Sequence, residues 1–252
     1  IKFWFAMSYA KGPVTRIIRE KERAQYDHDV VHSILDAGLI AHVAYLDATG
    51  RLRVSPMVYG REGSTVYIHG HVGCGALKQG SLDVCLSVAF DDGIVLARSA
   101  FNSSMNYRSV IAHGKAEELH GEAKSRALDV ITNNVCPGRA QQARAMTEPE
   151  LTTTRVLALP LQDGLVSGKI RAHGVGDDEP DTTNRPDIWA GIIPITRVFG
   201  APVTEHDCKV AVPPNVAALQ TPAGDSGKIT AVFGVGVVLG ALGACLIAKQ
   251  LK

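Results

Sequence analysis

A glycine-rich turn is the stretch of this sequence whose residue types point most directly to ligand chemistry. The turn contains, in order, His69, Gly70, His71, Gly73, Cys74, Gly75 and Lys78. Glycines in a strand-to-helix turn expose backbone N–H groups, and these groups together with a lysine can hold a phosphate. An ordinary glycine loop is the alternative, and a glycine loop by itself is weak evidence for a binding site.

Two groups of histidines have the spacing of partial metal sites. His28 and His32 lie four residues apart in a predicted helix, but no third ligand is near them in the sequence, so a surface or capping role is favoured. His69 and His71 share one face of a predicted strand with Cys74 close behind, and a metal there is the less favoured interpretation. We therefore assign no metal site from the sequence.

The composition limits the class of protein. The chain has 252 residues, of which 46% are hydrophobic and 20% are charged, and its formal net charge is +1. These values exclude a disordered or collagen-like chain, and the lack of a basic excess argues against a nucleic-acid partner. The five cysteines are scattered and never form a CxxC pair, which argues against a disulfide framework or a zinc ribbon.

The elements that would position the glycine-rich turn are mostly short strands. Helices are predicted over residues 27–37, where Asp27 can cap the first turn, and over residues 121–135. Strands are predicted over residues 39–47, 51–59, 65–69, 82–90, 94–98, 106–119, 155–161, 165–172 and 188–199. Short antiparallel strands with two or three helices predict a mainly β (α+β) fold, a closed or split β-barrel rather than a Rossmann sheet.

Several single residues predict local backbone features. The sequence Asp91-Asp92-Gly93 predicts a hairpin between the strands on either side of it. Gly114, inside a long strand, predicts a bulge, and Pro56 predicts an edge position or a bulge. The acidic, turn-rich residues 174–186 predict a loop.

The C-terminal region is predicted to hold the chain in a membrane through one transmembrane helix. Residues 229–248 are 20 residues without a charge, and such a helix spans about 30 Å, the thickness of a bilayer core. A buried core helix or a strand pair is the alternative. Gly236, Gly240 and Ala244 form a small-residue ridge suited to a helix partner, although glycine is common in membrane helices generally.

Seven segments of the sequence resemble a known family. They are residues 19–27 (REKERAQYD), 54–59 (VSPMVY), 66–70 (VYIHG), 93–110 (GIVLARSAFNSSMNYRSV), 156–161 (VLALPL), 168–171 (GKIR) and 188–194 (IWAGIIP). Together they resemble the pyridoxamine 5′-phosphate oxidase-related proteins, the FMN-binding split-barrel family that includes nitroimidazole-resistance-type flavoproteins. The resemblance implies a split-barrel domain (19–200) after an N-terminal extension (1–18). Outside it, the prolines of residues 201–228 predict a linker, and the uncharged residues 229–248 predict the membrane anchor.

The resemblance implies a homodimer of split barrels with FMN at the subunit interface. It implies that the strand at residues 54–57 follows the flavin ring. The glycine-rich turn would hold the phosphate, and the SMNYRSV segment would supply polar contacts near the flavin. The implied cofactor-binding residues are Val54, Ser55, Pro56, Met57, His69, Gly70, Cys74, Lys78, Ser104, Asn106, Tyr107, Arg108, Lys169, Arg171 and Trp189. No catalytic residue is assigned, and haem, which some split-barrel relatives bind, is the less favoured cofactor.

The glycine-rich turn is also where the sequence departs from the family pattern. Relatives usually read like HGSxxSRxLR, whereas here His71, Cys74 and Gly75 replace the polar and arginine positions and Lys78 keeps the only basic charge. Two functions therefore remain open. The first is a membrane-anchored FMN protein with oxidoreductase chemistry. The second is a non-catalytic accessory subunit of a mitochondrial inner-membrane complex, which a removed transit peptide before Ile1 would suit.

Overall fold

The computed structural model describes residues 7–75, 77 and 80–221 of the chain. These residues belong to two units, Ile1–Ile195 and Thr196–Lys252, which are described separately. In the described part of the chain, no helix is both long enough and apolar enough to span a bilayer. The predicted anchor at residues 229–248 and the side chain of Lys78 lie outside the described residues.

Six antiparallel strands form a closed barrel in the first unit. They are β2 (Ile40–Leu46), β3 (Leu52–Glu62), β4 (Thr65–His71), β5 (Leu82–Leu96), β6 (Ser104–Glu118) and β7 (Thr154–Pro160). Their order is β6-β7-β4-β3-β2-β5, and a further pairing between β5 and β6 closes the ring. The predicted mainly β, split-barrel fold is therefore confirmed.

Three further strands extend the barrel sheet. The short strand β1 (Ala24–Gln25) pairs with β8 (Val166–Arg171), and β8 pairs with β6. On the other side, β9 (Gly191–Pro194) pairs with the end of β5. The predicted strand over residues 188–199 is thus reduced to four residues, and the predicted loop over residues 174–186 contains the short helix α5 (Glu179–Asn184).

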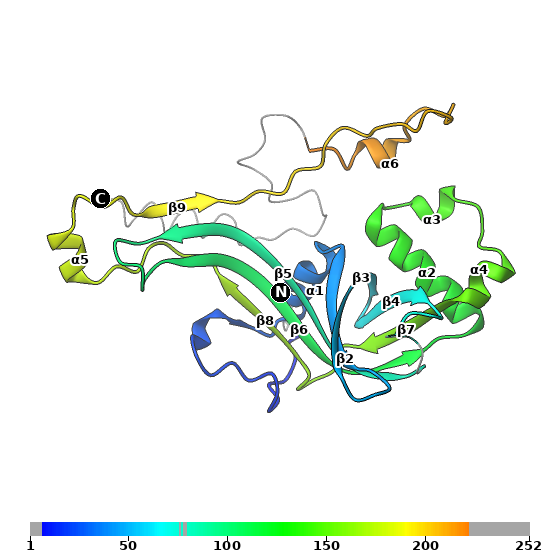
Figure 1. The fold of residues 1–252 in the computed structure, drawn as a ribbon, viewed down its shortest axis with the longest axis horizontal. Helices are drawn as coiled ribbons and strands as arrows, with labels where there is room; N and C mark the ends of the chain where they lie inside the picture. The colour runs from blue at the N-terminus through cyan, green and yellow to red at the C-terminus, as the bar shows by residue number, and fades with distance from the viewer. Residues whose placement is uncertain (1–6, 76, 78–79, 222–252) are drawn as a thin grey trace, which may run out of the picture. The chain divides into compact units, whose positions relative to one another are not determined.

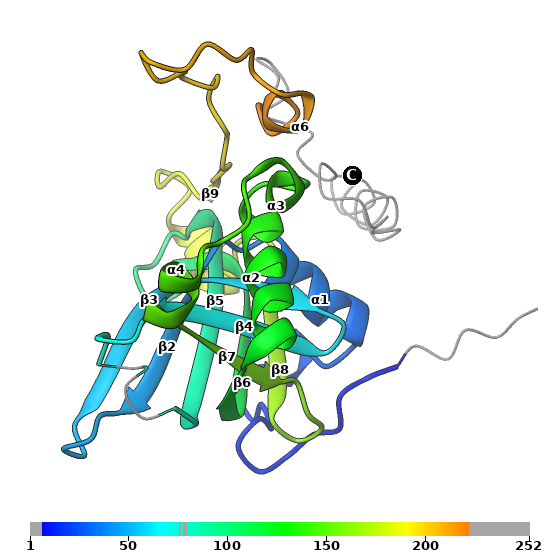
Figure 2. The ribbon, with the colours of Figure 1, turned by 90° about the vertical axis from the view of Figure 1, so that its right-hand side faces the viewer.

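Two helices cover the barrel, as Figure 2 shows. Helix α1 (His28–Asp36) begins as predicted, because the Asp27 carboxylate accepts the Val30 N–H at 3.1 Å. Its residues Val31, Ile34 and Leu35 are buried in the main core. Helix α2 (Gly121–Val135), which matches its predicted bounds, packs on β3 and forms a second apolar cluster with α4 (Glu148–Thr153). The remaining helical segments are η1 (Lys21–Arg23), α3 (Arg139–Gln142) and, in the second unit, α6 (Pro214–Ala217).

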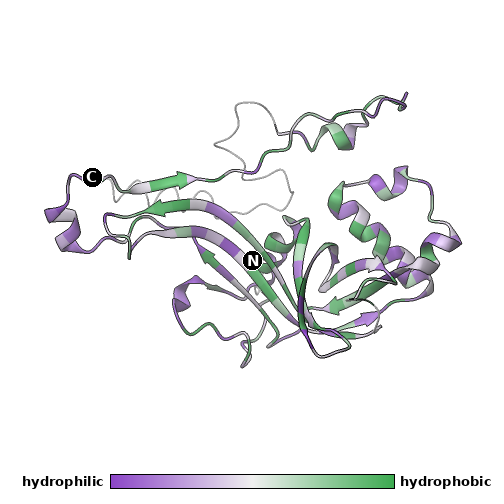
Figure 3. Ribbon diagram, viewed as in Figure 1, coloured by the Kyte–Doolittle hydropathy of each residue, from purple (hydrophilic) through white to green (hydrophobic). Residues whose placement is uncertain are grey.

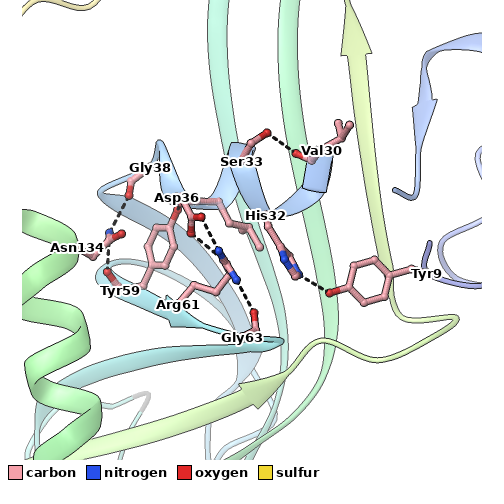
Figure 4. Close-up of polar contacts among 11 residues, drawn as sticks. Tyr9, Val30, His32, Ser33, Asp36, Gly38, Tyr59, Arg61, Gly63 and Asn134 are labelled. Carbon is pink, nitrogen blue, oxygen red and sulfur yellow. Dashed lines mark hydrogen bonds and ion pairs between the residues drawn. The ribbon is translucent and has the colours of Figure 1, made fainter. Parts of the chain in front are cut away.

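A small set of polar contacts fixes α1 and α2 against β3 (Figure 4). Arg61 of β3 pairs with Asp36 at the end of α1, with 2.7 Å between Nε and Oδ1. Asn134 of α2 donates to the carbonyls of Gly38 and Tyr59 at 2.9 and 3.0 Å. Gly60 allows this approach, because a Cβ there would lie 2.8 Å from the backbone of Ile131 in α2.

Strands β5 and β6 continue together beyond the barrel as an arm, visible on the left of Figure 1, and β8 and β9 pair along its two edges. Their pairing runs from Leu82↔Ala116 to Val95↔Ser104, with one register shift between Asp91 and Gly93. The predicted hairpin at residues 91–93 is therefore wrong: Asp92 is an extra residue in a continuous strand, because β6 keeps pairing with β5 beyond this point. Gly114, where a bulge was predicted, pairs in register with Val84.

The alternation of buried and exposed residues along β5 shows how this bulge affects packing. Before the bulge, Leu82, Val84, Leu86 and Val88 are buried; after it, Gly93 and Val95 are buried. The buried positions thus change from even to odd numbers, since one extra residue exchanges the two faces of a strand. Figure 3 shows apolar stretches along these strands that are interrupted by polar residues.

The chain before α1 is held on that helix by one aromatic residue (Figure 4). Tyr9 is 3% exposed, its hydroxyl lies 2.8 Å from His32 Nε2, and its ring lies 4.0 Å from that of His28. The two histidines thus contact Tyr9. No group of three metal-ligating side chains is present among the residues that the structure describes.

We predict that His32 makes the stability of the fold depend on pH. Burial, with repulsion from Arg61 and His28, lowers the pKa of His32 to about 4. The unfolded chain binds a proton on this residue at about pH 6.5, so stability falls as the pH decreases from 6.5 to 4. The expected loss is about 1–2 kcal/mol, because the ring is only partly buried.

Urea denaturation at pH 7 and pH 5 would measure this effect. His32→Gln should reduce the difference between the two pH values, whereas His120→Gln, at an exposed histidine before α2, should leave it unchanged. An equal pH dependence in the wild type and in His32→Gln would contradict the prediction.

Candidate functional site

The glycine-rich turn after β4 is tightly folded. The His71 carbonyl accepts the Cys74 N–H at 2.8 Å, and the Cys74 carbonyl accepts the Leu77 N–H at 2.9 Å. Gly70 is required here, because a Cβ at this position would lie 2.6 Å from Cδ1 of the fully buried Leu77. The turn is therefore held by its own backbone bonds and by one apolar anchor.

Arg155 of β7 supplies a cation beside this turn, and the sequence interpretation missed it. Arg155 is the strand partner of Gly70, and its Nη1 donates to the Leu77 carbonyl at 2.5 Å. Its Nε lies 3.3 Å from the Glu118 carboxylate at the end of β6. Arg155 lies 85 positions after Gly70 in the sequence, and only the pairing of β4 with β7 brings the two together. The sequence therefore gave no signal for this contact beyond the positive charge of the residue.

His69 lies half-buried on β4, where Val156 is its strand partner. Burial lowers the pKa of this histidine, so the ring is neutral at pH 7. Nδ1 is buried and has no hydrogen-bond partner among the described residues. A neutral imidazole with a free nitrogen can accept a hydrogen bond from a ligand or bind a metal.

The predicted ring-binding strand alternates between two sides of the barrel. Val54 and Pro56 are exposed, whereas Met57 is buried and the Ser55 hydroxyl lies 3.3 Å from the Tyr45 hydroxyl. At Pro56, β3 pairs only with β2, which fits the predicted edge position.

An apolar surface covers the same side of β2, β3 and β6, and we call it the open face. It consists of Ile40, Leu46, Leu52, Val54 and Ile111, whose exposed fractions range from 39% to 72%. The strand register places two histidines on it: His42, the partner of Pro56, and His113, which lies across β5 from Ala44. Five large apolar side chains on one surface are typical of a face that another molecule covers.

The arm carries most of the remaining predicted site residues. Arg171 is 4% exposed and its guanidinium donates to the Asn106 side chain at 2.5 Å and to two carbonyls of the following loop. Arg108 pairs with Asp92 at 3.2 Å and lies over the ring of Phe90. Asn106 and Arg171, predicted from separate segments, are thus brought together.

The other arm residues surround this pair. Tyr107 is the strand partner of Arg171, and Lys169 is the partner of Ser109. Ser104 is exposed where β6 begins, and Trp189 is 63% exposed before β9, so this tryptophan does not fill the core of the described unit.

The predicted site residues therefore form two groups. The turn group lies around β3 and the end of β4, next to Glu118, and the arm group lies around the start of β6. Twelve residues of β6 separate Asn106 from Glu118, which is about 40 Å along the strand at 3.3 Å per residue. The glycine-rich turn and Asn106 therefore lie at opposite ends of β6, whereas Pro56 of β3 lies between these ends, across β2 and β5 from Ile111.

Comparison with known proteins gives the family. The model of the pyridoxamine 5′-phosphate oxidase family matches residues 27–169, more than half of the chain. The chain belongs to this family. The match confirms the resemblance of the sequence segments, and it covers all six barrel strands but ends at Lys169, before Arg171 and Trp189. No match was found among curated proteins.

Two solved structures are similar over most of the chain. The FAD and haem binding protein from Mycobacterium smegmatis is 33% identical, with a TM-score of 0.74, and the match covers 79% of this chain and 97% of that one. The flavocytochrome Anf3 from Azotobacter vinelandii is 32% identical, with a TM-score of 0.77, and the match covers 85% of this chain and 100% of that one.

We predict that Arg155 rigidifies the glycine-rich turn. Arg155→Gln removes the bond to the Leu77 carbonyl and the ion pair with Glu118, so the turn should open more often. Hydrogen exchange of the Gly73, Cys74 and Leu77 amides should accelerate about tenfold, since losing one charge-assisted hydrogen bond costs about 1–2 kcal/mol. Arg144→Gln, which breaks an exposed pair with Glu150, is the control. Unchanged exchange in the turn would refute the role of Arg155.

Proposed function

We propose that this protein is a flavin-binding redox protein that acts as a homodimer, with each flavin held between two protomers. The observation that carries the proposal is that the glycine-rich turn and Asn106 lie at opposite ends of β6. In a dimer, the arm of one protomer can reach the turn group of its partner, so that both groups contact one flavin. The bound flavin would supply the electron or hydride transfer, and the protein would bind and orient it.

The charges of the two groups suit a flavin phosphate. Arg155 places a guanidinium beside the turn, where it also pairs with Glu118, and the sequence of the turn adds the basic residue Lys78. The arm contributes the buried Arg171 and the half-buried Arg108 and Lys169. Arg155 approaches the turn from β7, and a phosphate bound there would share this guanidinium with Glu118.

The surfaces suit a second copy of the chain. The open face presents five exposed apolar side chains, and the arm adds exposed Ile94, Leu96, Ile192 and Ile193. Burying apolar surface of this extent stabilises an interface by about 25 cal/mol per Å² before the costs of association. A dimer would cover both regions.

Complementation between two damaged chains tests the shared site. Gly75→Asp places a negative charge in the turn, where there is room for the side chain, and Lys169→Glu reverses a charge in the arm group. We expect each variant alone to lose flavin at least tenfold. The co-expressed heterodimer of the two variants should regain about one flavin per dimer, because one of its two sites is undamaged.

The matched control is a heterodimer of the wild type with the double variant. In this arrangement each shared site carries one damaged group, so no flavin should bind. A site within one chain predicts the reverse result: one flavin in the control and none in the complementation pair. A flavin absorption spectrum and the oligomeric mass of each tagged pair are the measurements. Wild-type protein that binds neither FAD nor FMN would refute the proposed function.

Haem is a second candidate cofactor. Both solved relatives are haem proteins or cytochromes by description, and the open face combines exposed apolar side chains with His42 and His113. Imidazole in apolar surroundings is the donor chemistry that haem iron takes. On this proposal the haem lies in the dimer interface and one of the two histidines holds its iron.

Spectroscopy of protein from haem-replete cells tests the haem proposal. We expect a Soret band in the wild type, and its loss or shift in either His42→Ala or His113→Ala. His120→Ala, at an exposed histidine off the open face, should leave the spectrum unchanged. A wild type without a Soret band that also fails to bind added haemin would exclude this cofactor.

The finer parts of the sequence interpretation also remain proposals. We propose that residues 229–248 hold the flavoprotein at a membrane, where lipid and a helix partner would contact the small-residue ridge. The alternative of a non-catalytic accessory subunit in the mitochondrial inner membrane depends on a flavin-free barrel, which the same absorption spectrum would reveal.

A further inference from the structure

The chain segment that precedes α1 folds into a loop beside β8 (Figure 1). Residues of this loop line a hollow. The hollow has a volume of about 570 Å³. Its lining includes the cations Lys11, Arg16 and Lys21 and, next to them, Pro13, Ile17 and Tyr26. No carboxylate side chain is part of the lining.

These three cations are not neutralised in the described part of the chain. None of them forms an ion pair with a described carboxylate, whereas the nearby Glu20 and Glu22 both pair with Arg23, at 2.6 and 3.6 Å. The Lys11 ammonium lies 5.3 Å from the centre of the Tyr26 ring. The hollow therefore has a net positive charge next to an aromatic face, a combination that suits an anionic aromatic ligand.

The loop around the hollow is held in place at several points. Gly12 lies against Gly164 so closely that a Cβ would clash with the Gly164 carbonyl, and the Thr15 hydroxyl donates to this carbonyl at 3.0 Å. The Tyr26 hydroxyl donates to the Thr15 carbonyl at 2.8 Å and accepts the Ile17 N–H at 3.2 Å. Such a fixed loop pays little conformational entropy when a ligand binds.

The hollow is adjacent to the arm group. Ala24, which lines it, is the strand partner of Lys169. Burial and the charge of Arg23 both lower the pKa of Arg171. Lys169 thus lies at the border of the hollow, whereas Arg23 near it is paired with Glu20 and Glu22.

We infer that the hollow binds the adenylate part of FAD, so that FAD is the preferred flavin. FAD differs from FMN by an added adenosine monophosphate, which is an anionic phosphate joined to an aromatic base. Lys11, Arg16 and Lys21 would contact the phosphate, and Tyr26 and Ile17 would pack against the adenine. This inference rests on the proposed function. The proposed function places the flavin ring between two protomers, and the inference places the adenylate of the same FAD molecule in the hollow.

Titration of flavin-depleted full-length protein with FAD and with FMN, followed by flavin fluorescence, tests the inference. We expect the wild type to bind FAD more tightly than FMN. The triple variant Lys11→Ala/Arg16→Ala/Lys21→Ala should bind FAD roughly 10- to 100-fold more weakly while its FMN affinity changes less than about twofold. The control Arg51→Ala/Arg139→Ala/Lys209→Ala removes three exposed cations elsewhere and should keep the preference for FAD.

Two further measurements separate the adenylate from other anions and from damage to the fold. AMP should compete with FAD but not with FMN, and inorganic phosphate at equal ionic strength should compete much less. If the triple variant unfolds, Lys21→Gln alone should still reduce the FAD preference. Equal affinity of the wild type for FAD and FMN, or an equal loss of both in the folded triple variant, would overturn the inference. Binding of neither flavin would instead refute the proposed function.

Discussion

The pairing of β6 with three other strands is the constraint on which the structure depends. Along its length β6 pairs with β5 and β8, and at its end it pairs with β7, so the same strand closes the barrel and forms the arm. Its two ends carry the two groups of site residues, because Asn106 lies near the start and Glu118 at the end. The length of one strand therefore sets the distance between the glycine-rich turn and Asn106.

The sequence predicted the elements well where local signals were strong. Asp27 marked the start of α1, and the apolar spacing of Ala127, Leu128 and Ile131 marked α2. Prediction failed at residues 91–93, where an Asp-Asp-Gly sequence typical of a hairpin lies within a continuous strand. The turn propensity of these three residues is overridden by the backbone hydrogen bonds that β5 makes with β6 on both sides of them. A short-range sequence pattern does not reveal this pairing.

The sequence predicted which residues belong to the candidate site, but it did not predict that they form two groups in space. Segment resemblance identified Asn106 and Arg171, and the structure joins them through a hydrogen bond. The role of Arg155 could not be predicted, since its distance from Gly70 in the sequence hides their pairing in the barrel. The charges around the turn thus depend on tertiary structure, which brings both Arg155 and its partner Glu118 to it.

The bulge at Asp92 has a consequence for how this family member can evolve. Substitutions along the arm change single side chains, whereas the insertion or deletion of one residue near Asp92 would exchange the inward and outward faces of the strand beyond it. Ile94 and Leu96 would then turn inward, and Val95, now fully buried, would turn to solvent. The arm should therefore tolerate many amino-acid changes but vary in length only by two residues at a time.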